Sequence, residues 1–406
     1  MCNHDADARL GGIDRRSFLR TSAMTFAAFA LPWGSRAAHA APAGGAGLPV
    51  LVAIYMRGAA DGLNLVVPVR DRARYEQLRP TIALKDKDLL TLTPQFSLNK
   101  ALQPLHPLYN RGELAVLHAV GSPHPTRSHF EAQDYMERAA PGSTSGPGWL
   151  NQSLVPIGGA GALRGVGLGK RPLALTGDED TFATPSLDAA AGPDPRRRAA
   201  LAAMFAQTAG VYPRTGASAF AAADVVKTVD RTTTVAYPGG PFGTGLKDAA
   251  ALIKADLGAR VICVDVGGWD HHNDLVNRMA GVGAGFAAAL AAFWEDLGPA
   301  WRAKTCALTM TEFGRTAAEN GSFGTDHGHG SVMFALGGGL NGGRVIADWP
   351  GLAAAQLNEG RDLKVTTDFR DVFAEVLNKH MKVNLGDMTP IFPGRAPKAA
   401  DFPGLF

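Results

Sequence analysis

The chain of 406 residues carries 40 basic and 37 acidic residues, a formal net charge of +3, and three cysteines. A charge this small gives no indication of a nucleic-acid or anionic-membrane partner. So few cysteines exclude a disulfide scaffold, and Cys263 and Cys306, which lie in apolar runs, are expected to be buried hydrophobic residues.

Residues 1–40 are predicted to be a twin-arginine signal peptide. Residues 13–20 match the export pattern, the apolar stretch 24–33 is too short to span a bilayer, and residues 38–40 fit the small-x-small cleavage rule. Removing the segment's five arginines and three aspartates leaves 35 basic against 34 acidic residues, a net charge of +1. We therefore expect a periplasmic or secreted protein that meets the twin-arginine translocase during export, with no nucleic-acid partner and no stable membrane anchor.

Five apolar runs are predicted to be buried strands. They are nearly continuous rather than alternating, as in parallel strands that are covered on both faces. Helical patterns lie between them, at 279–297, where Phe286, Phe293 and Trp294 share a face, and at 368–381. Alternating strands and helices predict an α/β fold with a mostly parallel central sheet. The strands are expected at 50–56, 114–120, 260–266, 305–311 and 331–336.

The middle of the chain has a different composition. Residues 141–170 are rich in Gly, Ser and Pro without a sustained period, whereas 195–211 and 217–229 have helical patterns. We therefore expect one domain over 41–406, with an irregular or helical insertion at about 142–245 that covers the site.

Ionisable residues gather near one end of each predicted strand, and the segment 324–330, Gly-Thr-Asp-His-Gly-His-Gly, is the densest of these groups. Functional groups in open α/β sheets collect beyond the carboxyl ends of the strands. His and carboxylate side chains on such loops predict a divalent metal site, with Zn²⁺ or Mn²⁺ as one or two ions. A Gly-rich turn whose histidines bind only backbone is the alternative for 324–330, and His271 is expected to point away. The candidate ligands are Asp61, Asp270, His272, Glu312, Asp326, His327 and His329.

Ser128 is the candidate nucleophile, because a hydroxyl held against a divalent cation is more easily deprotonated. Its alternative role is to cap the helix expected from residue 130. Arg57, Arg127 and Arg315 are candidate oxyanion contacts, although each could instead pair with a carboxylate of the site.

Five segments resemble the domain-of-unknown-function 1501 family, whose members are twin-arginine-exported and similar to the alkaline phosphatase and sulfatase superfamily. They are MRGAADGLN at 56–64, TRSHFEAQDY at 126–135, GWDHH at 268–272, EFGRT at 312–316 and GTDHGHG at 324–330. The resemblance implies an alkaline-phosphatase-like αβα sandwich. By motif order it also implies an early Asp ligand at Asp61, a nucleophile at Ser128, and further ligands at Asp270, His272, Glu312 and His327 or His329. Glu312 stands where the superfamily usually has Asp-His.

The favoured function is therefore an exported metal-dependent hydrolase of small or polymeric phosphate or sulfate esters. A non-catalytic exported binding or assembly protein on the same fold is the alternative. A serine hydrolase of acyl esters is disfavoured, because no Gly-x-Ser-x-Gly motif surrounds Ser128.

Overall fold

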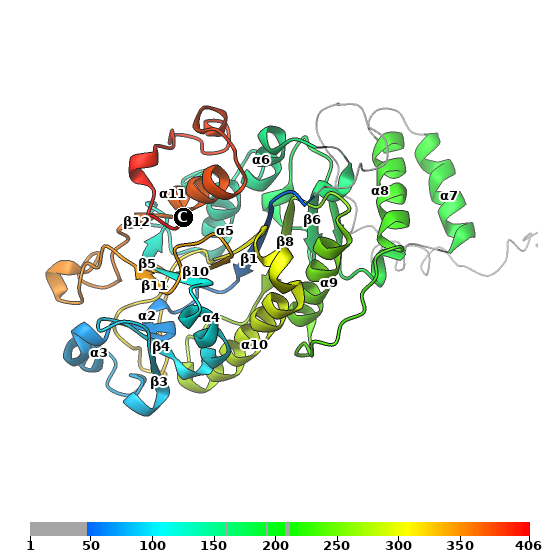
Figure 1. The fold of residues 1–406 in the computed structure, drawn as a ribbon. Coiled ribbons are helices and arrows are strands. Elements are labelled where there is room, and N and C mark those ends of the chain that lie inside the picture. Colours follow the sequence, from blue (N-terminus) through cyan, green and yellow to red (C-terminus); the bar gives the residue numbers. More distant parts are fainter. Residues whose placement is uncertain (1–46, 160, 192–193, 208–211) are drawn as a thin grey trace, which may run out of the picture.

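A twisted, mostly parallel sheet of nine strands forms the centre of the protein, with helices on both faces (Figure 1). The computed structural model describes residues 47–406 apart from 160, 192–193 and 208–211. The strand order is β11-β5-β10-β9-β1-β8-β6-β7, and β12 pairs with β5. The strands are β1 (Val50–Met56), β5 (Leu114–Gly121), β6 (Gly165–Leu168), β7 (Phe182–Thr184), β8 (Val261–Val266), β9 (Thr305–Met310), β10 (Ser331–Gly337), β11 (Arg344–Ile346) and β12 (Thr367–Asp368).

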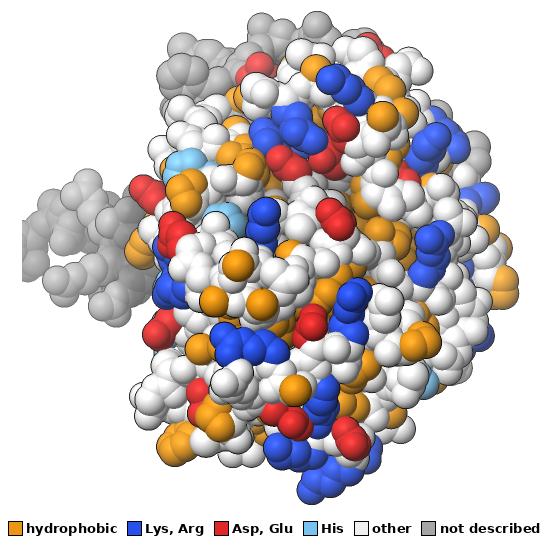
Figure 2. Space-filling model, turned by 90° about the vertical axis from the view of Figure 1, so that its left-hand side faces the viewer, with side chains coloured by type: hydrophobic (Ala, Val, Ile, Leu, Met, Phe, Trp, Pro, Cys, Tyr) orange, Lys and Arg blue, Asp and Glu red, His pale blue; other side chains and the backbone are white. Residues whose placement is uncertain are grey.

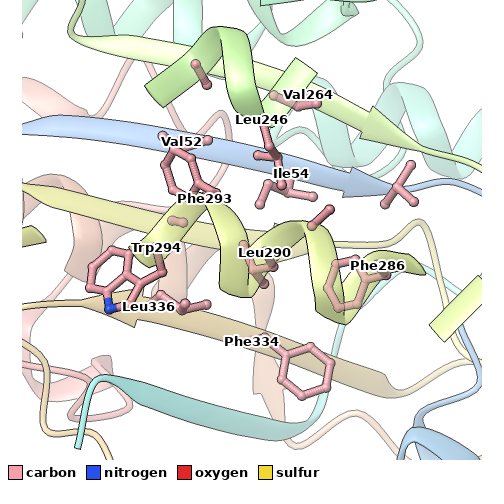
Figure 3. Packing of buried hydrophobic residues seen from close by; sticks show 14 of the residues in the cluster. Val52, Ile54, Leu246, Val264, Phe286, Leu290, Phe293, Trp294, Phe334 and Leu336 are labelled. Carbon is pink, nitrogen blue, oxygen red and sulfur yellow. The ribbon is translucent and has the colours of Figure 1, made fainter. Parts of the chain in front are cut away.

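Two apolar clusters cover the two faces of this sheet. Alternate residues of β1 point to opposite faces, so that Val52 and Ile54 join one cluster and Leu51 and Ala53 join the other. On the first face Phe286, Leu290 and Phe293 point from a long helix toward the strands (Figure 3). The first face is covered by α9 (Pro241–Ala255) and α10 (Leu275–Arg302), and the second by α5 (His129–Arg138), α6 (Trp149–Ile157) and α11 (Phe369–Glu375). This confirms the predicted αβα sandwich.

The five predicted strands correspond to β1, β5, β8, β9 and β10, with ends that agree within one residue. Of the predicted helices, 279–297 lies inside α10, and 368–381 becomes α11 followed by a π-helical turn, Val376–His380. The helix expected over 195–211 is α7 (Pro195–Ala206), and 217–229 overlaps α8 (Tyr212–Val226). Cys263 and Cys306 are buried and unbridged, as expected. The expected signal peptide, 1–40, lies outside the described residues.

The segment 142–245 contains more than irregular chain and helices. Its strands β6 and β7 pair in parallel and extend the sheet beyond β8, while α7 and α8 lie outside that edge (Figure 1). The two strands are short, and the pattern did not predict them, because Gly165 and Gly167 interrupt the apolar run of β6. The segment is thus partly built into the sheet.

Strand β10 runs antiparallel to both of its neighbours, β5 and β9, although β5 and β9 point the same way as β1. The loop that precedes β10 therefore lies at the same edge as the loops that follow β1, β8 and β9. This reversal places 324–330 among the carboxyl ends of the parallel strands.

The remaining elements connect this core. A small sheet joins β2 (Val66–Val67), β4 (Ser97–Asn99) and β3 (Leu89–Thr91), near the short helices α2 (Gly62–Leu65), α3 (Arg72–Leu78) and α4 (His106–Asn110). Helix α10 is long and apolar enough to cross a membrane by length and composition, but Phe286, Leu290 and Phe293 on it pack in the core. The face shown in Figure 2 mixes Lys and Arg with Asp and Glu, without a large area of one charge sign.

Candidate metal centre

Segments from five places in the chain meet at the carboxyl edge of the sheet. They are the turn after β1, the start of α5, the segments after β8 and β9, and the loop before β10. Glycines allow the close approach, because a Cβ at Gly324 would lie 2.3 Å from the carbonyl carbon of His272, and one at Gly328 would lie 2.2 Å from that of Arg315. The Gly-rich pattern of 324–330 is therefore a steric requirement.

Three imidazole rings converge at this edge through the same ring atom. The Nε2 atom of His327 lies 3.0 Å from Nε2 of His129 and 2.9 Å from Nε2 of His272. His129 is the first residue of α5, His272 follows β8, and His327 precedes β10. Three nitrogen donors from separate elements therefore face one another.

Asp270 adds an oxygen donor to the three nitrogens. Its Oδ1 lies 3.1 Å from Nε2 of His272 and 3.6 Å from Nε2 of His327, and its Oδ2 lies 3.7 Å from Nε2 of His129. The buried Arg315 donates to Oδ1 of Asp270. Burial would raise the pKa of Asp270, but the hydrogen bond from Arg315 and its charge outweigh burial and lower it. Asp270 is thus an ionised donor.

The opposite ring nitrogen of each histidine is held by an acceptor. Nδ1 of His129 lies 2.8 Å from Oε1 of Glu312, Nδ1 of His272 lies 3.2 Å from Oδ1 of Asp326, and Nδ1 of His327 lies 2.8 Å from the carbonyl oxygen of Arg127. Such acceptors assign the proton to Nδ1 and leave the Nε2 lone pairs of His129 and His327 available, whereas Nε2 of His272 also faces Nη1 of Arg315 at 3.5 Å. Metal-binding histidines usually have this arrangement.

Glu312 is a fully buried carboxylate that has no Lys or Arg partner among the described residues. Burial would raise its pKa, but hydrogen bonds from His129 and the backbone N–H of Gly58 lower it. The same contact with Glu312 raises the pKa of His129. A buried negative charge without a fixed cation requires positive charge nearby, as a proton on His129 or a metal ion beside it.

Three of these residues have the spacing of ligands to a transition-metal ion. The donor atoms of His129, Asp270 and His327 all lie within 4.8 Å of one another. Ligand atoms at 2.0–2.1 Å from a tetrahedral zinc ion lie roughly 3.3 Å from one another, and the contacts within this group measure 3.0, 3.6 and 3.7 Å. His272 lies beside the group, 2.9 Å from Nε2 of His327. Imidazole nitrogens with a carboxylate suit Zn²⁺ better than the oxygen-seeking Mg²⁺ or Ca²⁺.

The structure divides the predicted ligands into three groups. Asp270 and His327 belong to the group of donor atoms with His272 directly beside them, whereas Glu312 and Asp326 contact the Nδ1 atoms of histidines instead. Asp61 and His329 lie outside the group. Asp61 is buried and accepts hydrogen bonds from Arg79 (2.8 Å) and Thr325 (3.1 Å), which anchors the loop 324–330.

The two other histidines of these loops, His329 and His271, are both buried. His329 is 8% exposed, and its backbone carbonyl accepts from Gly314, while its Nδ1 has no partner in the described part of the chain. His271 is fully buried and is not among the grouped donors, and its ring lies 6.3 Å from that of Trp269.

Sequence reasoning did not select His129 as a donor. Its sequence neighbour Ser128 drew attention as a possible nucleophile, while the signal for His129 was its place at the start of a helix. The start of this helix indicates a metal ligand only once the structure shows that β9 and the loop before β10 end beside it.

The three predicted oxyanion arginines have protein partners. Arg57 pairs with Asp265 and Glu137, and Arg127 pairs with Asp362 and Glu359. Arg315 donates to Asp270 and to the carbonyl oxygens of 58 and 59.

Ser128 is the N-cap residue of α5, but its side chain makes no cap hydrogen bond. It is partly buried, directly between Arg127, whose carbonyl holds His327, and the donor His129.

A family model described as a protein of unknown function, DUF1501, matches residues 113–391. No curated protein matches the sequence.

Solved structures that match include the lipoteichoic acid synthase LtaP from Listeria monocytogenes. The identity is 9%, the match covers 86% of this chain and 76% of that chain, and the TM-score is 0.38. The C-terminal periplasmic domain of EcEptC from Escherichia coli, in complex with Zn, matches with 10% identity, 74% and 77% coverage and a TM-score of 0.33. The alkaline phosphatase from the Antarctic bacterium TAB5 matches with 9% identity, 72% and 92% coverage and a TM-score of 0.31. Similarity this low says nothing about the reaction of this chain, whose chemistry rests on its own residues.

Proposed function

The chain belongs to the DUF1501 family of proteins of unknown function, and on this premise we propose that it is an exported, metal-dependent hydrolase of phosphate or sulfate esters. The observation that carries the proposal is the convergence of three Nε2 atoms and the Asp270 carboxylate, with each opposite Nδ1 atom held by an acceptor.

His129, His327 and Asp270 would hold one ion with His272 beside them, and Zn²⁺ is favoured over Mn²⁺ because nitrogens outnumber the carboxylate. The balance of charges around these histidines also favours a bound cation. The carboxylates of Asp270, Asp326 and Glu312 contact the three histidines, whereas Arg315 contributes one positive charge beside them. With neutral histidines this leaves two uncompensated negative charges. When bound, the ion acts as a Lewis acid that polarises an ester oxygen and favours a deprotonated nucleophile.

Ser128 is the proposed nucleophile. Its uncapped position leaves the first N–H groups of α5 without a side-chain acceptor from the cap residue, and those groups favour anions. The start of α5 would therefore receive the anionic part of an ester, while His129 on the same turn holds the ion.

Metal analysis of the purified mature protein and assays with aryl phosphate and aryl sulfate test the proposal. We expect about one equivalent of zinc and hydrolysis that falls by at least a hundredfold in Ser128→Ala. Metal-free wild-type protein, or full activity in Ser128→Ala, would contradict it. Chelation should abolish turnover, and added Zn²⁺ should restore it.

Export is the second part of the proposal, and it rests on the twin-arginine pattern of residues 13–20 and the cleavage motif of residues 38–40. Replacing Arg15 and Arg16 with Lys should retain the protein in the cytoplasm. Fractionation and N-terminal sequencing of the wild-type protein should give a periplasmic or secreted product that begins at Ala41.

A non-catalytic exported binding protein remains the second candidate, and one observation favours it. Arg57, Arg127 and Arg315, which an ester hydrolase could use on its substrate, are all paired with carboxylates or carbonyl groups of the chain itself. Bound zinc without turnover of any phosphate or sulfate ester would select this candidate.

A further inference from the structure

Helix α5 presents three polar side chains on the face that it turns toward the end of β1. His129, Gln133 and Glu137 follow one another at intervals of four residues and therefore lie on one side of the helix. His129 contacts Glu312, and Glu137 contacts Arg57 at 2.8 Å. Gln133 lies between these two contacts and touches both partners.

The hydrogen bonds of Gln133 fix the orientation of its amide. Nη1 of Arg57 lies 3.2 Å from Oε1 of Gln133, and Nε2 of Gln133 lies 3.2 Å from Oε1 of Glu312. Arg57 can only donate, so the amide oxygen must face Arg57 and the amide nitrogen must face Glu312. The amide therefore donates to the carboxylate that holds His129.

Arg57 has little freedom to move. Its Nε and Nη2 atoms donate to the two carboxylate oxygens of Asp265 at 2.9 and 3.2 Å, and its guanidinium carbon lies 3.9 Å from the ring centroid of Tyr55. The 2% exposed Glu137 is held in turn by the backbone N–H of Ala174 at 3.0 Å. Arg57 is thus a rigid donor for Gln133.

We propose that Gln133 is a positioning residue, which fixes the Glu312 carboxylate so that His129 presents Nε2 to the metal ion, and that Arg57 sets the orientation of Gln133. This inference rests on the metal site of the proposed function. Oε1 of Glu312 accepts from three directions, the imidazole of His129, the backbone of Gly58 and the amide of Gln133. Without the Gln133 amide, Oε1 of Glu312 has fewer fixed partners. The imidazole of His129 is then held in a less defined orientation.

The choice of a neutral amide has a physical reason. An Arg or Lys at position 133 would also donate to Glu312, but its charge would neutralise the carboxylate and repel a cation nearby. An amide orients the carboxylate and leaves its negative charge available to the His129 ring. Charge on this carboxylate makes the imidazole a stronger ligand.

The test is a titration of folded, metal-free protein with Co²⁺, followed by its visible absorption spectrum. Gln133→Met keeps the length of the side chain and removes both hydrogen bonds. We expect it to weaken Co²⁺ binding about tenfold and to change the absorption bands, which report ligand geometry. Gln77→Met is the matched control, because Gln77 also accepts from an arginine on a helix, Arg74 at 2.6 Å, but is exposed on α3. It should bind as wild type does.

Wild-type affinity and spectrum in Gln133→Met would overturn the inference, whatever the variant does to unfolding. If wild-type protein itself binds no Co²⁺ or Zn²⁺, the proposed function fails, and the inference is decided on metal-free protein by NMR. Solvent exchange of the Nδ1 proton of His129 should then be several-fold faster in Gln133→Met than in wild type, and an unchanged rate would reject the positioning role.

Discussion

Nδ1 of His327 lies 2.8 Å from the carbonyl oxygen of Arg127, so the loop before β10 is tied directly to the start of α5. The acceptor is a backbone group, which no side-chain substitution removes. The ring of Phe313 packs against both His129 and His327, with centroids 5.0 Å away in each case. The two histidines are thus held relative to each other by backbone, by an aromatic ring and by their own facing nitrogens, which supports a preorganised donor pair.

Histidine substitutions should separate donors from neighbours. His129→Ala removes one of the three grouped donors and should reduce bound zinc in purified protein to background. The matched variant is His329→Ala, which lies in the predicted motif but outside the donor group, and which should retain about one equivalent. Metal analysis by mass spectrometry measures both, and equal losses in the two variants would refute the donor assignment.

Glycine 328 should be essential for a steric reason. A Cβ at Gly328 would lie 2.2 Å from the backbone of Arg315, so Gly328→Ala must displace the loop that carries His327. We expect Zn²⁺ affinity to fall at least tenfold. Gly321→Ala is the control, because nothing lies within 4 Å of its added Cβ, and its affinity should equal that of wild type. Competition with a chromophoric chelator gives both constants.

The two carboxylates behind the histidines should differ in strength. Glu312 is fully buried, whereas the side chain of Asp326 is 54% exposed and therefore screened by water. Glu312→Gln should weaken Zn²⁺ binding by roughly 10- to 100-fold, and Asp326→Asn by clearly less. Calorimetric titration of the two variants tests this order, and a larger effect of Asp326→Asn would show that burial is not the deciding factor.

Asp61 should matter for stability rather than for metal ligation. Asp61→Ala leaves the fully buried Arg79 without its carboxylate, and breaking a buried pair this way costs about 3–5 kcal/mol. Asp86→Ala also removes an arginine partner, but Asp86 is 98% exposed, and the free energy of unfolding should change by less than about 0.5 kcal/mol. Denaturant unfolding of the metal-free variants measures both, and similar losses would contradict the assignment.

Acid should destabilise the protein through His118. Burial lowers its pKa from 6.5 to about 4, and its Nδ1 accepts from the N–H of Ala119 at 2.8 Å, so the native state disfavours a second proton. The unfolded chain binds more protons between these two values, and the free energy of unfolding therefore falls as pH decreases from 6.5 toward 4. His118→Gln should give a shallower pH dependence in this window, measured by unfolding at several pH values. An unchanged slope would exclude His118 as a source.

Much of the architecture could be predicted because it depends on local pattern. Continuous apolar runs such as 50–56 and 305–311 specify buried strands by themselves, and the loops that follow them carry the ionisable residues. The short strand β6 could not be predicted, because its glycines are compatible with a strand only beside β8. Its pairing is a tertiary effect that overrides local propensity.

The site was predicted as a region but not as a set of ligands. Residue type suggested that Glu312, Asp326 and Asp61 could bind metal, yet a carboxylate becomes a donor or a partner of histidine according to which nitrogen it meets in space. His129 gained its role from Glu312, which lies 183 residues away. No spacing along the chain encodes that contact.

The reversed strand β10 also determines when the centre can exist. Because β10 lies between β5 and β9, in the interior of the sheet, His327 reaches the other donors only once residues 331–337 have been inserted between two strands synthesised earlier. Only the completely folded chain would then bind the metal ion, because partly folded chains would lack the full set of donors. If the proposed twin-arginine export of folded cargo holds, the centre would be assembled before the chain leaves the cytoplasm, and the metal supply of that compartment would decide which ion is loaded.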